Sequence, residues 1–138
     1  MAAFQFTAKR SLATGYTVGD TVEIAIRLRA ADKKTTAVRN VHTSIGGARI
    51  TRLQRIDVSY ACQTIPIKNG VVAPETENFV DLMRMFLDSV IAGEEFLAEF
   101  FSDVIDSNSA SYEMDGDYSE SYTQPDRYSF DFSVIEIQ

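Results

Sequence analysis

The side chains best suited to nucleophilic chemistry are one cysteine and one histidine, Cys62 and His42. A catalytic thiol needs a base within hydrogen-bond reach, and nothing in the spacing of these two residues indicates such a pair. Cys62 falls on the apolar side of an alternating segment, and cysteine is among the most buried residue types, which favours an inert core thiol. His42 lies near the Gly46-Gly47 turn, and one histidine without further His or Cys ligands does not make a zinc site. The sequence therefore predicts no catalytic residue and no cofactor.

Acidic residues in the C-terminal half are the second place to look for chemistry. Glu113, Asp115 and Asp117 surround Gly116, and their carboxylates would suit calcium, but the ligand order and the terminal Glu of an EF-hand are missing. Paired carboxylates for glycoside hydrolysis need a cleft that nothing in this stretch indicates. The glycines of residues 15–19 match neither a P-loop nor a dinucleotide fingerprint. We therefore expect a solvated acidic hairpin and no metal site.

Charge is distributed unevenly along the chain. Residues 1–68 carry eleven Lys or Arg against four acids, and residues 69–138 carry two against sixteen, so the halves have net charges of +7 and −14. Halves of opposite sign either neutralise each other within one domain or face neighbouring copies and other partners. Both arrangements favour association.

Length and composition define the class of protein. A chain of 138 residues with 45% hydrophobic and 24% charged residues predicts one soluble domain over residues 1–138. The longest apolar runs are far shorter than the ~20 residues of a membrane helix, and the first residues lack the pattern of a secretion signal, so we expect no membrane contact. A total charge of −7 without a nucleic-acid motif argues against specific nucleic acid binding.

Several segments alternate apolar and polar residues, the period of a strand with one covered face. These segments are 21–29, 49–67 and 128–134, and residues 111–115 and 118–122 are two further short strand candidates. The strand at 49–67 should be central in its sheet. Between the first two segments, residues 30–49 predict a long basic loop that can act as an arm, and residues 102–122 predict an acidic loop or hairpin.

Apolar residues spaced three and four apart predict one helix over about residues 74–92. Pro74 is suited to the first helical position, Glu75 and Glu77 favour the first turn, and Gly93 ends the helix. The apolar stripe consists of Phe79, Leu82, Met83, Phe86, Leu87 and Val90. We expect this stripe to pack on the strands rather than to bind a partner. The predicted fold class is mainly β (α+β), a β-sandwich or split β-barrel with one packed α-helix.

The order of these elements resembles a known family. The residues that carry the resemblance are RIDVSY at 55–60, TIP at 64–66, FLDSV at 86–90, GEEF at 93–96 and RYSFDFSV at 127–134. The chain is similar to the small distal tail proteins, or minor tail proteins, of long-tailed (siphovirus-type) bacteriophages. The family often has proline in the aromatic stretch after the helix, whereas residues 96–103 have none, so the conformation of that segment stays open.

The resemblance implies a structural protein and not an enzyme. Such proteins form a homo-oligomeric ring, commonly a hexamer, where the tail tube meets the tip, and their partners are the tail tube protein and the tail tip or hub proteins. The expected location is the virion tail, after synthesis in the cytoplasm of the bacterial host. The family has no catalytic residues to carry over, so charge alone suggests the subunit contacts. These contacts are Lys33, Lys34, Arg39, Glu113, Asp115 and Asp117.

Two alternatives remain beside a distal tail ring. Tail tube subunits and tail terminators are also small, β-rich, ring-forming proteins, and sequence separates them poorly from distal tail proteins. An alternative of another class is a monomeric β-barrel that binds a hydrophobic ligand, in which Phe96, Phe100, Phe101 and the tyrosines would line the pocket.

Overall fold

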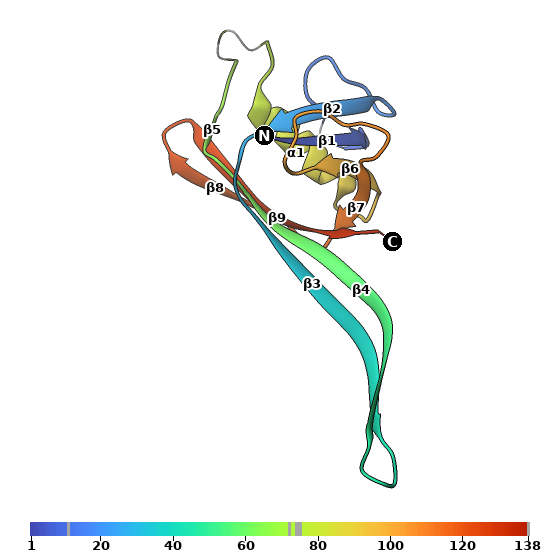
Figure 1. Cartoon of the computed structure of the whole chain (residues 1–138). Helices are drawn as coiled ribbons and strands as arrows, with labels where there is room; N and C mark the ends of the chain where they lie inside the picture. Colours follow the sequence, from blue (N-terminus) through green and yellow to red (C-terminus); the bar gives the residue numbers. More distant parts are fainter. Residues whose placement is uncertain (11, 72, 74–75, 138) are drawn as a thin grey trace.

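The structure is a computed structural model that describes residues 1–10, 12–71, 73 and 76–137 (Figure 1). The elements of this part of the chain are β1 (Ala2–Thr7), β2 (Thr21–Ile26), β3 (Leu28–Thr43), β4 (Arg49–Thr64), β5 (Ile67–Lys68), α1 (Phe79–Val90), β6 (Phe96–Glu99), β7 (Ala110–Met114), β8 (Ser119–Gln124) and β9 (Arg127–Glu136). The prediction of a mainly β fold with one packed helix is confirmed.

All of these strands belong to one antiparallel sheet. Its order is β2-β1-β6-β7-β9-β4-β3, and β5 and β8 also pair with β9. Strands β2 and β3 stand at the two ends of this order, although only Arg27 separates them in the chain. The sheet therefore curves until its end strands are joined through Arg27. Strand β4 is second from one end of this order, and only residues 59–63 of it pair with both β3 and β9, so the predicted central position holds for that part alone.

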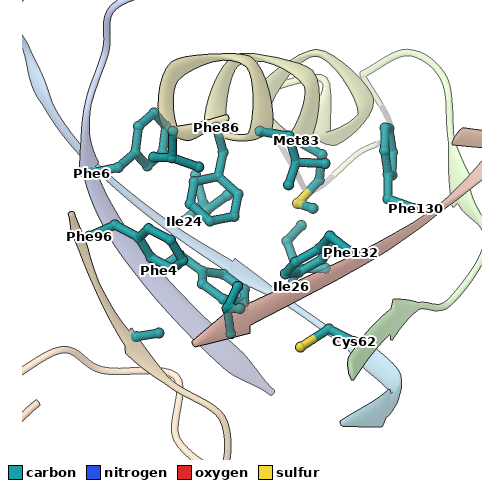
Figure 2. Close-up of a cluster of buried hydrophobic side chains, with 14 of the residues drawn as sticks. Phe4, Phe6, Ile24, Ile26, Cys62, Met83, Phe86, Phe96, Phe130 and Phe132 are labelled. Carbon is teal, nitrogen blue, oxygen red and sulfur yellow. The ribbon is translucent and has the colours of Figure 1, made fainter. Parts of the chain in front are cut away.

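The core lies between α1 and the sheet. Phe86 is fully buried, and its ring centroid lies 4.9 Å from that of Phe4, 5.0 Å from Phe6 and 5.1 Å from Phe96. Figure 2 shows Phe86 and Met83 pointing from the helix toward the strands. The expected apolar stripe of α1 is thus the face that packs on the sheet.

The helix begins later than the sequence predicted. It starts at Phe79, because the side chain of Asn78 accepts a hydrogen bond from the Val80 amide at 3.1 Å and caps the first turn. The predicted start at Pro74 and Glu75 lies outside the described residues. The predicted end is confirmed, since the Gly93 amide donates to the carbonyl of Val90 at 3.1 Å and Gly93 has φ +102°, a conformation that glycine adopts readily.

The prediction of a loop over residues 30–49 is wrong. Strands β3 and β4 form one long hairpin that projects from the body of the molecule, and only residues 44–48 make the turn (Figure 1). Polar residues occupy both faces of this hairpin, so the alternation that marks a half-buried strand is absent. The Thr, Val and Ile residues of the segment still suit a strand.

The remaining segments follow the sequence prediction more closely. Strands β7 and β8 occupy the two short candidate segments, and residues 102–109 form a loop. The turn at residues 124–126 is confirmed, with Asp126 at φ +59°. Residues 96–99, whose conformation was open, form β6 between β1 and β7.

Candidate subunit interface

The outer part of the β3–β4 hairpin, residues 33–56, is a strongly basic projection that we call the arm. It carries six Lys or Arg and no acid, and it leaves a net charge of −13 on the rest of the chain. The charge asymmetry of the sequence therefore corresponds to a separation in space between a basic arm and an acidic body. Charges arranged in this way steer an arm toward the body of another molecule.

One face of the arm carries an apolar stripe. Cross-strand partners share a face, and the pairs Ala37–Ile56, Arg39–Leu53 and Val41–Thr51 follow one another on the same side. Leu53 and Ile56 are three residues apart and would face opposite sides of a regular strand. The register shift between Val38 and Arg39 brings them to one face.

The stripe is open to solvent. The exposed fractions are 43% for Val41, 55% for Leu53 and 42% for Ile56. The arm projects from the body, so the described elements leave Val41 and Leu53 about half open to solvent (Figure 1). Apolar area arranged in this way marks an interaction surface.

An acidic groove lies at the base of the arm. It has a volume of about 460 Å³, and Asp32, Asp117 and Asp131 all line it, together with apolar atoms of Ala61 and Phe132. The structure gives none of the three aspartates an ion pair with a described residue. The groove therefore combines an apolar floor with unneutralised negative charge, which complements the basic, apolar arm.

The predicted contact residues separate into arm and body. Lys33 and Lys34 lie at the inner end of the arm, opposite Tyr60 and Ser59, and Arg39 lies at the bulge. Of the acidic residues, Asp117 lines the groove, Asp115 lies on the turn after β7, and Glu113 is half-buried in β7. Whether these residues contact another subunit stays a prediction.

Sequence reasoning missed two of the aspartates in the groove. Asp131 belongs to the polar face of the last strand, and Asp32 lies in the segment that was predicted as a loop. Pairing of β3 with β4 and of β4 with β9 brings Asp32 near Asp131, and pairing of β8 with β9 brings Asp131 near Asp117. The alternation of residues 128–134 was the available signal for Asp131, but its partner strand was unknown.

The acidic hairpin of β8 is fixed to the helix. Arg84 forms an ion pair with Glu120, and this hydrogen bond raises the pKa of the guanidinium. The hydroxyl of Tyr118 donates to Asp88, and the guanidinium of Arg84 lies 5.2 Å from the ring centre of Tyr128. These contacts hold one side of the acidic groove in place.

The candidate nucleophile is buried. Cys62 is 3% exposed, and burial raises the pKa of its thiol to about 12, so at neutral pH it stays protonated. His42 lies near the far end of the arm, opposite Ile50. Among the described residues, no group of three or more His, Cys, Asp and Glu side chains is arranged to hold a metal ion.

The phenylalanines of the ligand-binding alternative do not share a pocket. Phe96 and Phe100 are buried, and Phe100 stacks on Tyr60 with ring centroids 4.2 Å apart. Phe101 is 85% exposed. The expected lining is therefore divided between the core and the solvent. Within the described part of the chain, no helix has the length and apolar character needed to cross a membrane.

Comparisons with known proteins give a weak likeness to a solved tail structure. No family model matches the chain, and neither does any curated protein. Among solved structures, the chain is similar to one from the "Tail of empty GTA particle computed with helical refinement, C6 symmetry". The TM-score is 0.46 at 15% identity, and the match covers 98% of this chain and 90% of that chain. A TM-score below 0.5 does not establish a common fold.

Proposed function

We propose that this chain is a structural subunit of a bacteriophage tail that assembles with copies of itself into a ring at the junction between tail tube and tip. The observation that carries the proposal is the arm, a basic hairpin with an uncovered apolar stripe attached to an acidic body. The tail itself is inferred from the resemblance of the sequence to distal and minor tail proteins.

The arm exposes apolar side chains that a second molecule would cover. An isolated two-stranded hairpin is at best marginally stable in water, because it buries little apolar surface. The arm exposes Val41, Leu53 and Ile56, and burying these side chains against a second surface would stabilise the arm and the assembly together. Such coupling is typical of subunits that function only in an assembly.

The acidic groove is the best receiving surface for the arm. Both combine apolar atoms with charge, and their charges are opposite. Because the arm leads away from the body that carries the groove, its outer end reaches the groove of another copy and not its own (Figure 1). Contacts between two different surfaces of identical chains close into rings or continue as filaments.

Within this class, the arm also favours a second candidate, a tail tube subunit. Strands rise by about 3.3 Å per residue, so the roughly ten residues on each side of the arm can span about 30 Å. An arm of this length can connect a ring to the next layer, and a contact that repeats from layer to layer builds a tube. A distal tail ring would make the contact once. A tail terminator remains a third possibility, and the ring number of six follows from the resemblance alone.

Charge reversal followed by rescue tests the proposal. The experiment measures the mass of the full chain by light scattering on a sizing column, and images the same samples by negative-stain electron microscopy. Reversal of Arg39 and Arg52 to Glu should weaken assembly, and reversal of Asp117 and Asp131 to Lys in the same chain should partly restore it. Arg29→Glu, an exposed position outside the arm, is the control.

The images separate the candidates. Single rings support a distal tail protein, and stacked rings or tubes support a tube subunit. If reversal of Arg39 and Arg52 leaves assembly unchanged, the proposed contact between arm and groove is wrong. A stable monomer that gains thermal stability with a hydrophobic ligand would instead support the ligand-binding barrel.

A further inference from the structure

A second surface, separate from the arm and the acidic groove, has the features of a binding pocket. It lies between the end of β2, residues 65–68 around β5 and the first turn of α1, with a volume of about 380 Å³. Its apolar lining includes Ile26, Ile67 and Phe79. Pockets of this size are in the range that accepts an aromatic side chain together with its neighbours. We call this site the basic pocket.

Cations surround the apolar lining of the basic pocket. Arg27, Lys68 and Arg127 are exposed lining residues, and the described lining includes no acid. None of the three forms an ion pair with a described residue. A pocket with an apolar interior and, at its edge, three cations that no described acid neutralises suits an occupant that has an apolar anchor flanked by carboxylates.

The loop after β6 carries such a segment. In residues 101–106, FSDVID, Phe101 is 85% exposed and Val104 is 59% exposed. Asp103 and Asp106 are both exposed and lie between or beside these apolar residues. An exposed phenylalanine is a costly feature for a surface unless it is buried against a partner, and aromatic anchors of this kind dominate many interfaces.

The segment does not fill the basic pocket of its own chain. Phe100 holds the start of the loop by stacking on Tyr60, and the Ile105 amide donates to Glu23 Oε1 at 3.3 Å, over the middle of β2. Phe101 remains open to solvent, and no residue of the segment is among those that line the pocket. Residues 101–106 can therefore reach a basic pocket only on another molecule.

We propose that the basic pocket of one copy receives residues 101–106 of a second copy, with Phe101 seated against the apolar lining and Asp103 and Asp106 paired with Lys68 and Arg127. Charge complementarity selects this occupant, because the segment offers an apolar side chain to the apolar lining and carboxylates to the cations at the edge. This contact is independent of the arm, and it holds whether or not the assembly is a tail.

Cross-linking between isotopically distinct copies tests the contact directly. Full-length protein labelled with ¹⁵N is mixed with unlabelled protein and treated with a carbodiimide, which joins an amine to a carboxylate that touches it. We expect mixed-isotope peptides in which Lys68 is joined to Asp103 or Asp106. Cross-links of Lys68 only within one copy, or only to acids elsewhere, would overturn the proposal, as would a monomer without mixed-isotope products at every concentration.

Two sets of variants sharpen this test. Phe101→Ser should lower the yield of the mixed-isotope cross-link about tenfold or more, whereas Val18→Ser, at a position 64% exposed on another loop, should leave it unchanged. Both positions are exposed, so the far-UV circular dichroism should stay that of the parent chain. An unchanged yield for Phe101→Ser would show that the phenylalanine is not the anchor.

Charge exchange provides the second set. Lys68→Glu with Arg127→Glu should weaken association in light scattering, and Asp103→Lys with Asp106→Lys in the same chain should restore it. Failure of rescue, while the reversal of Arg39 and Arg52 in the arm still dissociates the assembly, would reject the basic pocket and leave the proposed tail function standing.

Discussion

The arm and the body of this protein are stabilised in different ways. In the body, α1 and the sheet enclose a cluster of buried aromatic and aliphatic side chains. In the arm, every residue is exposed except the half-buried Val38, and backbone pairing joins the two strands. The body is therefore stable because of what it buries, and the arm depends on a surface that another molecule provides.

The largest effect is expected from a cavity in the body. Phe86→Ala removes the ring that contacts Phe4, Phe6 and Phe96, and loss of a buried phenylalanine should lower the free energy of unfolding by about 3–5 kcal/mol. Urea unfolding followed by circular dichroism measures this change. Val18→Ala, at an exposed position outside the proposed contacts, should stay within about 0.5 kcal/mol of the parent. Equal effects for the two variants would contradict the core assignment.

A smaller effect, and on a different quantity, is expected from the arm. Leu53→Ser should leave the stability of the monomer within about 0.5 kcal/mol, because no core is disturbed. It should weaken assembly about tenfold, or about 1.4 kcal/mol, when measured by light scattering over a dilution series. Ile50→Ser lies on the opposite face of the arm and should have less effect. If Ile50→Ser weakens assembly more than Leu53→Ser does, the contact lies on the face of the arm that carries Ile50.

The helix cap gives a further contrast between the two regions. Asn78→Ala removes the side chain that accepts from the Val80 amide and should cost about 1 kcal/mol of stability. The matched change Asn40→Ala is in the exposed arm and should cost less than about 0.5 kcal/mol. Thermal unfolding of both variants measures the difference. A neutral Asn78→Ala would show that the first turn of α1 does not depend on its cap.

Alkaline pH should affect the body slightly and through named groups. Burial and the hydrogen bond to Asp88 raise the pKa of Tyr118 to about 12, and a hydrogen bond to Glu77 raises the pKa of Tyr16 to about 12. Because the pKa of each tyrosine is higher in the folded than in the unfolded chain, each adds to the free energy of unfolding. This contribution is complete below the ordinary pKa of about 10 and is lost as the pH rises toward 12.

The measurement is the melting temperature at steps between pH 9 and about 12. Tyr118→Phe should melt slightly lower at pH 9, because a hydrogen bond worth about 1 kcal/mol is gone, and it should lose part of the fall toward pH 12. The matched variant Tyr122→Phe changes an exposed tyrosine and should follow the parent chain. Identical curves for Tyr118→Phe and the parent would remove Tyr118 from the alkaline transition.

The elements that bury one face were predictable from the sequence. The stripe of α1 and the alternation of β9 follow directly from apolar spacing, because burial and periodicity have the same cause there. Residues 33–43 on the β3 side of the arm lacked that signal, since a strand exposed on both faces has no reason to alternate. These residues form a strand because they include β-prone residues and because they pair with β4. The spacing of apolar residues in the sequence does not reveal that pairing.

The residues of the acidic groove and of the basic pocket could not be predicted from the sequence, because the topology of the sheet decides which of them become neighbours. Asp32, Asp117 and Asp131 come from three strands or turns that are far apart in the sequence, and only the order of the sheet brings them together. The basic pocket likewise joins residues 25–27 to residue 127. Charge counting identified the sign of each region correctly, but it does not indicate which residues of that sign become neighbours.

The pairing of β9 has a consequence for biosynthesis. This strand, residues 127–136, pairs with β4, β5, β7 and β8, so the pairing of these four earlier strands is incomplete until β9 is synthesised. A ribosome adds about 5–20 residues per second, and until β9 emerges those strands expose unpaired edges that invite wrong pairing. The acidic groove, whose Asp131 belongs to β9, is completed in the same event. A chain can thus form its arm before its acidic groove exists. Only subunits in which β9 has paired can use both the arm and the groove in an assembly.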